Sequence, residues 1–260
     1  MELKKILDVF EQNVPHRYSD KLVEMTDGYD NSGLILKCGN EVHRALFSLD
    51  FSEKAVEKAI KEGADLIVTH HPAIYRPISS VSEDDSFGRA FIKAVKAGIS
   101  VFSMHLNLDV APYGVDDNLA KIFGENGKIL VPVEEGVGYG RLTETDATLK
   151  ELADRYEKAT GSKRVIFYGD PAKKIRKTVS FCGSGGDAPE IKLALSLGAD
   201  LMVSSDFKHH NLTEAVQNGL AVLAVTHYSA EAYGFSQFFE YIQNKLEGLP
   251  VLFWTDEALL

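Results

Sequence analysis

The sequence predicts an α/β protein of two similar α/β domains from an internal repeat, each with a mixed, largely parallel sheet flanked by helices. Two observations carry this prediction. A strand–helix–strand pattern occupies residues 44–69 and returns at residues 176–204, and the tetrapeptide Gly-Ala-Asp-Leu occurs at residues 63–66 and again at 198–201. Short apolar runs that alternate with helical patterns are typical of βαβ units, whose right-handed crossovers place the strand ends of each unit on one side.

The first copy follows an opening helix. The segment MELKKILDVFEQN reads as an amphipathic helix. The first copy then comprises a strand at 44–50, a helix at 52–63, a strand at 64–69, a helix ending at Gly98 and a strand at 99–104. From Gly63 to Gly98 is 35 residues, against 21 from Gly198 to Gly219 in the second copy. We assign the 14-residue excess to an inserted polar loop at residues 76–89.

The second copy repeats the order after a connecting region. It comprises a strand at 176–185, a helix at 188–198, a strand at 199–204, a helix ending at Gly219 and a strand at 220–225. In the connection, Thr148 and Glu151 form a capping-box pattern and Gly161 is a helix stop. The Gly-rich residues 134–142 are predicted to be a loop, because they lack the strand–GxGxxG–helix order of a dinucleotide site. Residues 183–186, Gly-Ser-Gly-Gly, fit either a phosphate cradle or a plain tight turn.

The repeat also suggests where the domains divide. We expect a crossover near residue 125 and a last helix, at about 229–246, that returns to the first domain. The predicted first domain is therefore residues 1–125 plus 229–260, and the second is residues 126–228.

Composition excludes several classes of protein. The net charge of −10 argues against nucleic-acid binding and against attraction to an anionic membrane. The two cysteines, Cys38 and Cys182, are too few and too far apart for a disulfide framework or a thiolate zinc site. No apolar stretch approaches the roughly 20 residues of a membrane span, and the charged N-terminal segment is unlike a signal peptide. We expect a cytoplasmic protein.

Histidines and carboxylates gather at the ends of the predicted strands, where α/β folds keep their chemistry. His70 and His71 follow the strand at 64–69, Asp109 follows the strand at 99–104, and His227 and Glu231 follow the strand at 220–225. Imidazole and carboxylate groups are the ligands of divalent transition metals. The set therefore predicts a metal site, in which Asp109 suits a bridge between two cations.

Each residue also has a plainer interpretation. The histidines fit an exposed polar loop, Asp109 a turn or cap, and Glu231 the positive end of a helix dipole. Three residues are weaker candidates for contact with ligands or substrate: Asn31, Asp50 and His105. Asp50 also fits a helix N-cap. We interpret Asp206, His209 and His210 as surface-loop residues.

Five segments in order along nearly the whole chain resemble the NIF-three-like family, the GTP cyclohydrolase 1 type 2 homologues. They are Asp30-Asn31-Ser32-Gly33-Leu34, Thr69-His70-His71-Pro72, His105-Leu106-Asn107-Leu108-Asp109, Gly183-Ser184-Gly185-Gly186 and His227-Tyr228-Ser229-Ala230-Glu231. The resemblance implies two α/β domains, a ring-shaped homohexamer and a dinuclear metal site. In that site one metal takes one histidine of the pair 70–71 with Asp109 and Glu231, and the other takes the second with His227 and Glu231, which bridges.

The expected cofactors are two divalent metal ions per chain, and zinc, iron, manganese and nickel all suit the donors. The favoured function is a metal-dependent hydrolase of a small, nucleotide-like substrate, in which the ions activate water and stabilise an oxyanion. The alternative is a metal-handling, regulatory or interaction scaffold in which the ions are structural.

Overall fold

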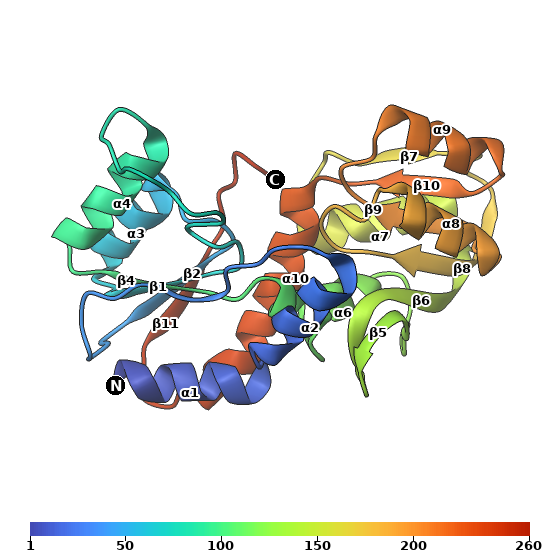
Figure 1. Ribbon diagram of the computed structural model, residues 1–260. Helices are drawn as coiled ribbons and strands as arrows, with labels where there is room; N and C mark the ends of the chain where they lie inside the picture. The colour runs from blue at the N-terminus through green and yellow to red at the C-terminus, as the bar shows by residue number, and fades with distance from the viewer. The chain divides into compact units, whose positions relative to one another are not determined.

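The computed structural model describes residues 1–260 and is an α/β protein with two mixed sheets flanked by helices (Figure 1). The chain divides into two compact units. Unit 1 comprises residues 1–111 and 239–256, and unit 2 comprises residues 112–238 and 257–260. The sequence placed the crossovers near residues 125 and 229, and the second structural division falls inside α10 (His227–Ile242). None of the helices combines the length and apolar character needed to cross a bilayer.

Unit 1 contains a five-stranded sheet in the order β1-β4-β3-β2-β11. The strands are β1 (Gly33–Leu36), β2 (Ala45–Ser48), β3 (Leu66–Thr69), β4 (Ser100–Ser103) and β11 (Val251–Trp254). The helices are α1 (Leu3–Asn13), α2 (Arg17–Thr26), α3 (Glu53–Glu62), α4 (Ser86–Lys96), α5 (Leu106–Val110) and the short 3₁₀ helix η1 (Gln243–Lys245). Only the edge strand β1 is antiparallel to its neighbour, so the prediction of a largely parallel sheet is confirmed here.

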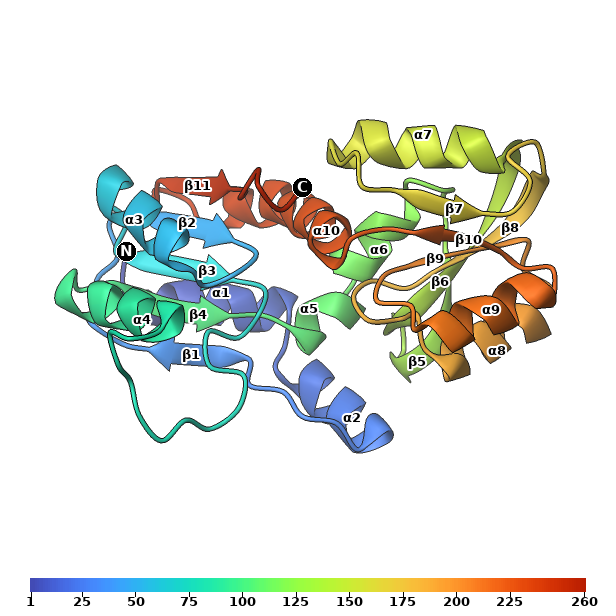
Figure 2. The same cartoon turned by 90° about the horizontal axis from the view of Figure 1, so that it is seen from above.

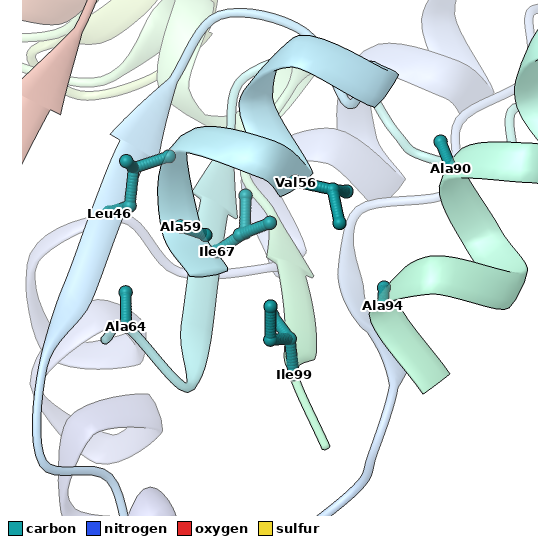
Figure 3. Close-up of a cluster of buried hydrophobic side chains, with 8 residues drawn as sticks. All are labelled: Leu46, Val56, Ala59, Ala64, Ile67, Ala90, Ala94 and Ile99. Atoms are coloured by element: carbon teal, nitrogen blue, oxygen red, sulfur yellow. The ribbon is translucent and has the colours of Figure 1, made fainter. Parts of the chain in front are cut away.

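The sheet of unit 1 buries both faces, as the alternation along β2 shows. Leu46 packs with residues of α3 and α4 in a buried cluster (Figure 3). Its neighbour Phe47 points to the other face, where its ring contacts Phe10 of α1 and Phe239 of α10 at centroid distances of 6.2 and 5.1 Å. Helices on both faces are the usual cover of a parallel sheet, and they fix the strand ends in place.

The predicted inserted loop is shorter than residues 76–89. Helix α4 already begins at Ser86, because the side chain of Asp85 accepts a hydrogen bond from the backbone N–H of Gly88 at 2.7 Å. An Asp in a polar stretch resembles loop composition, yet it is also a strong N-cap residue.

Unit 2 contains a six-stranded sheet in the order β5-β6-β8-β9-β10-β7 (Figure 2). The strands are β5 (Lys128–Glu134), β6 (Val137–Thr148), β7 (Ile166–Tyr168), β8 (Lys174–Ser180), β9 (Leu201–Ser204) and β10 (Ala221–Ala224). The helices besides α10 are α6 (Val115–Ala120), α7 (Leu149–Thr160), α8 (Ala188–Ser196) and α9 (His209–Gln217). The capping box at Thr148 and Glu151 is confirmed. β8, β9 and β10 are parallel and the other pairings are antiparallel, so "largely parallel" is wrong for this sheet.

The predicted loop at residues 134–142 is a β-hairpin, which explains that error. β5 and β6 pair across it, and the glycines of β6 lie where neighbouring groups come close. A Cβ on Gly138 would lie 2.4 Å from the Val131 carbonyl oxygen, and one on Gly140 would lie 2.2 Å from the Phe181 ring. Glycine in a strand often marks such a close approach. A strand that contains several glycines for this reason has the composition of a loop, and the prediction was therefore wrong.

The repeated tetrapeptide has the same structural role in both units. The Asp65 side chain accepts hydrogen bonds from the backbone N–H groups of His43 and Arg44 at 2.9 and 3.2 Å, and both residues lie just before β2. Asp200 accepts from the N–H groups of residues 176–177 at 2.8 and 3.0 Å, near the start of β8. Each aspartate therefore ties one strand start to the next. The common origin of the two units stays a prediction.

Candidate metal centre

The first donor cluster lies at the carboxyl ends of β3 and β4. These strands are parallel neighbours, so residues that follow them lie at the same edge of the sheet. The Leu49 carbonyl accepts hydrogen bonds from the N–H groups of both His70 and His71, at 3.1 and 3.0 Å. The chain therefore leaves strand geometry after Thr69. The two imidazoles are adjacent, with ring centroids 5.0 Å apart.

His70 and His71 are each held through Nδ1. His70 is fully buried, and its Nδ1 lies 2.9 Å from the carbonyl oxygen of Met104, which follows β4. Its Nε2 lies 3.4 Å from Oδ1 of Asp109, a buried residue of α5. His71 Nδ1 lies 2.7 Å from Oδ1 of Asp50, which follows β2. A histidine held in this way at Nδ1 offers Nε2 to a cation, and oxygen partners of this kind are typical around metal-binding histidines.

His105 belongs to the same cluster. Its Nδ1 lies 2.7 Å from Oδ1 of Asp30, whose other oxygen accepts hydrogen bonds from the hydroxyls of Ser19 and Ser32 at 2.5 and 2.6 Å. Burial alone would raise the pKa of Asp30, but the contacts with His105 and the two serines outweigh it and lower this pKa to about 2. Ring nitrogens of His70, His71 and His105 that could bind a metal ion all lie within 4.8 Å of one another.

The second donor cluster lies in unit 2, at the start of α10. His227 is the first residue of this helix, and its Nε2 lies 2.9 Å from Oε2 of Glu231, one turn on. His227 Nδ1 lies 2.7 Å from Oδ2 of Asp206, which follows β9. Glu231 is buried and lies beyond the first turn of the helix. Its contact with His227 makes the helix-dipole interpretation insufficient.

The Gly-Ser-Gly-Gly segment lies against this carboxylate. Gly183 has φ of +59°, and a Cβ there would lie 2.7 Å from Oε1 of Glu231. Its carbonyl accepts a hydrogen bond from the Ser205 hydroxyl at 2.5 Å. Residues 182–184 form bends in which Gly183 makes room for a carboxylate, and the two interpretations of this segment stay predictions.

Hydrogen bonds of Ser229 fix the start of α10 to α7. The Ser229 hydroxyl lies 2.6 Å from the Tyr156 hydroxyl of α7 and receives a hydrogen bond from Thr226 at 2.7 Å. Burial raises the pKa of Tyr156, with a further contribution from Glu231, so this phenol stays protonated. The donor end of the helix is thus fixed to the body of unit 2.

The weaker candidates and the surface residues have distinct outcomes. Asp50 is a partner of His71, and the N-cap of α3 is Ser52 instead. Asn31 donates a hydrogen bond to the Ile74 carbonyl at 2.6 Å, so it ties its segment to the loop after His71. His209 and His210 are exposed and begin α9.

Sequence reasoning missed two residues at the donor clusters, Asp30 and Asp206. Asp30 lies in a segment that only the family resemblance singles out. Asp206 is an exposed loop residue, as the sequence predicts, but its contact with His227 was not predicted. One signal of Asp206 is visible only in the backbone, where it adopts φ of +57°, a conformation rare for residues other than glycine.

The donor chemistry fits divalent transition metals. Both clusters combine imidazole with carboxylate, the set that suits zinc, iron, manganese and nickel. Four imidazoles have Nδ1 beside an oxygen atom, which sets the tautomer that a metal ligand needs. The fold and these clusters define an α/β protein with histidine–carboxylate groups that can hold metal ions.

The comparisons with known proteins specify this class further. The profile of the Duf34/NIF3 (NGG1p interacting factor 3) family matches residues 1–257, and the chain belongs to this family. It is similar to the GTP cyclohydrolase 1 type 2 homolog of Clostridium perfringens, with 31% identity over 89% of this chain and 87% of that protein. It is also similar to the protein NIF3 homolog of Schizosaccharomyces pombe, with 31% identity over 88% of this chain and 84% of the other.

Solved structures show the same fold. A Bacillus cereus protein related to NIF3 superposes with a TM-score of 0.85 at 21% identity, covering 99% of this chain and 97% of that chain. Reduced HcgD from Methanocaldococcus jannaschii superposes with a TM-score of 0.80 at 28% identity, covering 97% of each chain.

Proposed function

We propose that this protein holds two divalent metal ions through His70, His71, Asp109, His227 and Glu231 and uses them to hydrolyse a small, nucleotide-like substrate. The observation that carries the proposal is the repeated pattern at the donors. His70 and His227 each have Nδ1 fixed by an oxygen and Nε2 beside a carboxylate, at 3.4 and 2.9 Å. The assignment of both clusters to one dinuclear centre rests on the family resemblance.

The chain's own residues prepare the donors. Asp50 and Asp206 set the tautomers of His71 and His227, and their negative charge makes the imidazoles better ligands. When bound, a pair of divalent ions polarises substrate oxygens and activates water for attack. A nucleotide-like substrate accords with the names of the relatives, and in this chain it is part of the proposal.

Loss of the bridging carboxylate tests the metal centre. We expect Glu231→Ala, purified from cells and desalted, to lose both ions, because a bridging ligand serves both. Elemental analysis measures the metal content, and circular dichroism confirms the fold. Glu240→Ala, on the same helix, is the matched control and should retain both ions. Two metals per chain in desalted Glu231→Ala would refute the ligand assignment.

A panel of substrates tests the hydrolase. Protein with stoichiometric metal is assayed against nucleotides, phosphoesters and amides, and we expect turnover of one class that is lost on chelation. Failure across all three classes, together with unfolding on chelation, would instead support a structural, metal-handling role.

We also propose that the protein forms a homohexamer, as the resemblance implies. Light scattering on the purified protein should give six times the 28.6 kDa chain mass, and a monomer mass would overturn the proposal.

A further inference from the structure

His105 has no place in the five-residue ligand set, yet the structure gives it the surroundings of a ligand. Its ring centroid lies 5.3 Å from that of His70 and 5.7 Å from that of His71. Ring nitrogens of the three residues that could bind a metal ion fall within 4.8 Å of one another, and all three residues belong to unit 1. Three imidazoles around one point form a common divalent-metal site.

The three imidazole rings are oriented in the same way, by an oxygen atom beside Nδ1. Each Nδ1 lies 2.7–2.9 Å from an oxygen: the Met104 carbonyl for His70, and the carboxylates of Asp50 and Asp30 for His71 and His105. The nitrogen that each ring offers to a cation is therefore Nε2. Oxygen partners at Nδ1 are what metal-binding histidines carry.

A largely buried hydrogen-bond network holds His105 in place. The Asp30 side chain that holds it is 3% exposed and is itself held by two serine hydroxyls. The backbone N–H of His105 donates to the Ser32 hydroxyl at 3.0 Å, so main chain and side chain are fixed by the same network. The rings of Tyr75 and His105 are nearly perpendicular, with an interplanar angle of 89° and a centroid distance of 6.0 Å.

His43 provides a contrast in the same unit. Its Nδ1 also lies 2.7 Å from a carboxylate, that of Asp65, but its side chain is 81% exposed and no metal-ligand group includes it. A histidine–aspartate contact alone therefore does not make a site. The convergence of three such rings distinguishes the cluster of His105.

We propose that His70, His71 and His105 form a metal site, in which unit 1 alone binds one divalent transition-metal ion through three Nε2 atoms. The Asp109 carboxylate, whose Oδ1 lies 3.4 Å from Nε2 of His70, places a negative charge beside the ion. The site needs no donor of unit 2, although it shares His70 and His71 with the proposed dinuclear centre.

The test uses the full chain with the unit 2 donors removed, and Co²⁺ alone as the probe. We expect the His227→Ala/Glu231→Gln variant to be metal-free after desalting. Titrated with excess Co²⁺, it should bind one ion per chain, with the strong visible absorption of a low-coordinate site rich in nitrogen ligands. Circular dichroism establishes that the variant is folded.

Further substitutions in that variant identify the ligand. His105→Ala should lower the affinity for Co²⁺ by more than 100-fold and abolish the visible bands. Asp30→Asn, which keeps all three imidazoles, should lower the affinity about 10- to 100-fold and keep the bands. His43→Ala is the matched control and should change neither.

Two outcomes overturn the proposal. A folded double variant that binds no Co²⁺ shows that unit 1 does not capture an ion alone. Unchanged affinity and spectrum after His105→Ala show that His105 is not a ligand. Either result leaves the dinuclear proposal standing, since that rests on the metal content of the otherwise unsubstituted protein and of Glu231→Ala.

Discussion

Gly183→Ala tests whether metal binding depends on the position of the Glu231 carboxylate, once the strain that alanine introduces into the backbone is measured separately. The new Cβ would lie 2.7 Å from Oε1 of Glu231, whereas ordinary contact begins at 3.4 Å. The carboxylate, at the end of a flexible side chain, must therefore retreat by about 0.7 Å. Metal–ligand distances tolerate only about 0.2 Å. We expect the variant to fold but to bind metal about 10- to 100-fold more weakly, which is about 1.4–2.7 kcal/mol.

Gly198→Ala is the matched control in the same unit. Gly198 has φ of +64°, close to the +59° of Gly183, and a Cβ there would meet nothing within 4 Å. Both variants should lose about 1–2 kcal/mol of unfolding free energy from the left-handed backbone, measured by urea denaturation of the metal-free proteins. Only Gly183→Ala should lose metal affinity, measured by calorimetric titration. Wild-type affinity in Gly183→Ala would show that Glu231 in this position does not bind metal.

Three further predictions concern carboxylates and their partners. Asp206→Ala should lower metal affinity about 10- to 100-fold while the fold persists, because His227 loses the group that sets its tautomer; calorimetric titration measures this. Arg141→Met should destabilise unit 2 by about 3–5 kcal/mol in urea denaturation, because it leaves the fully buried Asp116 without its cation 3.1 Å away. Asp65→Asn should remove a pH-dependent part of stability. Burial opposes the charge of Asp65, but hydrogen bonds from the His43 ring and from backbone N–H groups lower its pKa. That contribution is present above the unfolded pKa and lost as pH falls through the folded value, so wild type and variant should converge in acid.

Each of these has a contradicting outcome. Metal affinity unchanged in Asp206→Ala would mean that His227 needs no orienting partner. A loss below about 1 kcal/mol in Arg141→Met would show that Asp116 is compensated by other groups. A stability difference between Asp65→Asn and wild type that stays constant from neutral to acidic pH would assign it to packing instead of charge.

The ends of β3 and β4 were predicted well, because apolar runs give way to polar residues there, and the positions of His70 and His105 followed directly. The strand predicted at residues 176–185 ends at Ser180 instead, because Phe181 and Cys182 are buried without being part of the strand. The hairpin of β5 and β6 was missed because its glycines are needed where residues far along the chain, such as Phe181, come close to the strand. Local composition carries no information about such contacts.

The partners of the histidines were harder to predict than the histidines themselves. Asp30 lies 75 residues from His105, and their contact depends on tertiary packing that a single sequence does not state. The pairs Asp50–His71 and Asp206–His227 are the more favourable cases, because each spans 21 residues. The members of each pair follow parallel neighbouring strands joined by one helix, so the predicted βαβ order already places them at one edge of a sheet.

The two strand-start aspartates imply a division of labour within each sheet. Asp65 and Asp200 fix strand register from the amino ends of β3 and β9, whereas the metal-donor candidates lie at the carboxyl ends. We therefore expect substitutions at the carboxyl ends to leave the strand register unchanged. In such a scaffold, evolution or protein design can exchange the reactive groups while the contacts that determine the fold stay the same. Because of that separation, two similar units can differ at their strand ends. The end of β3 carries His70 and His71, whereas the end of β9 carries Ser204 and Ser205.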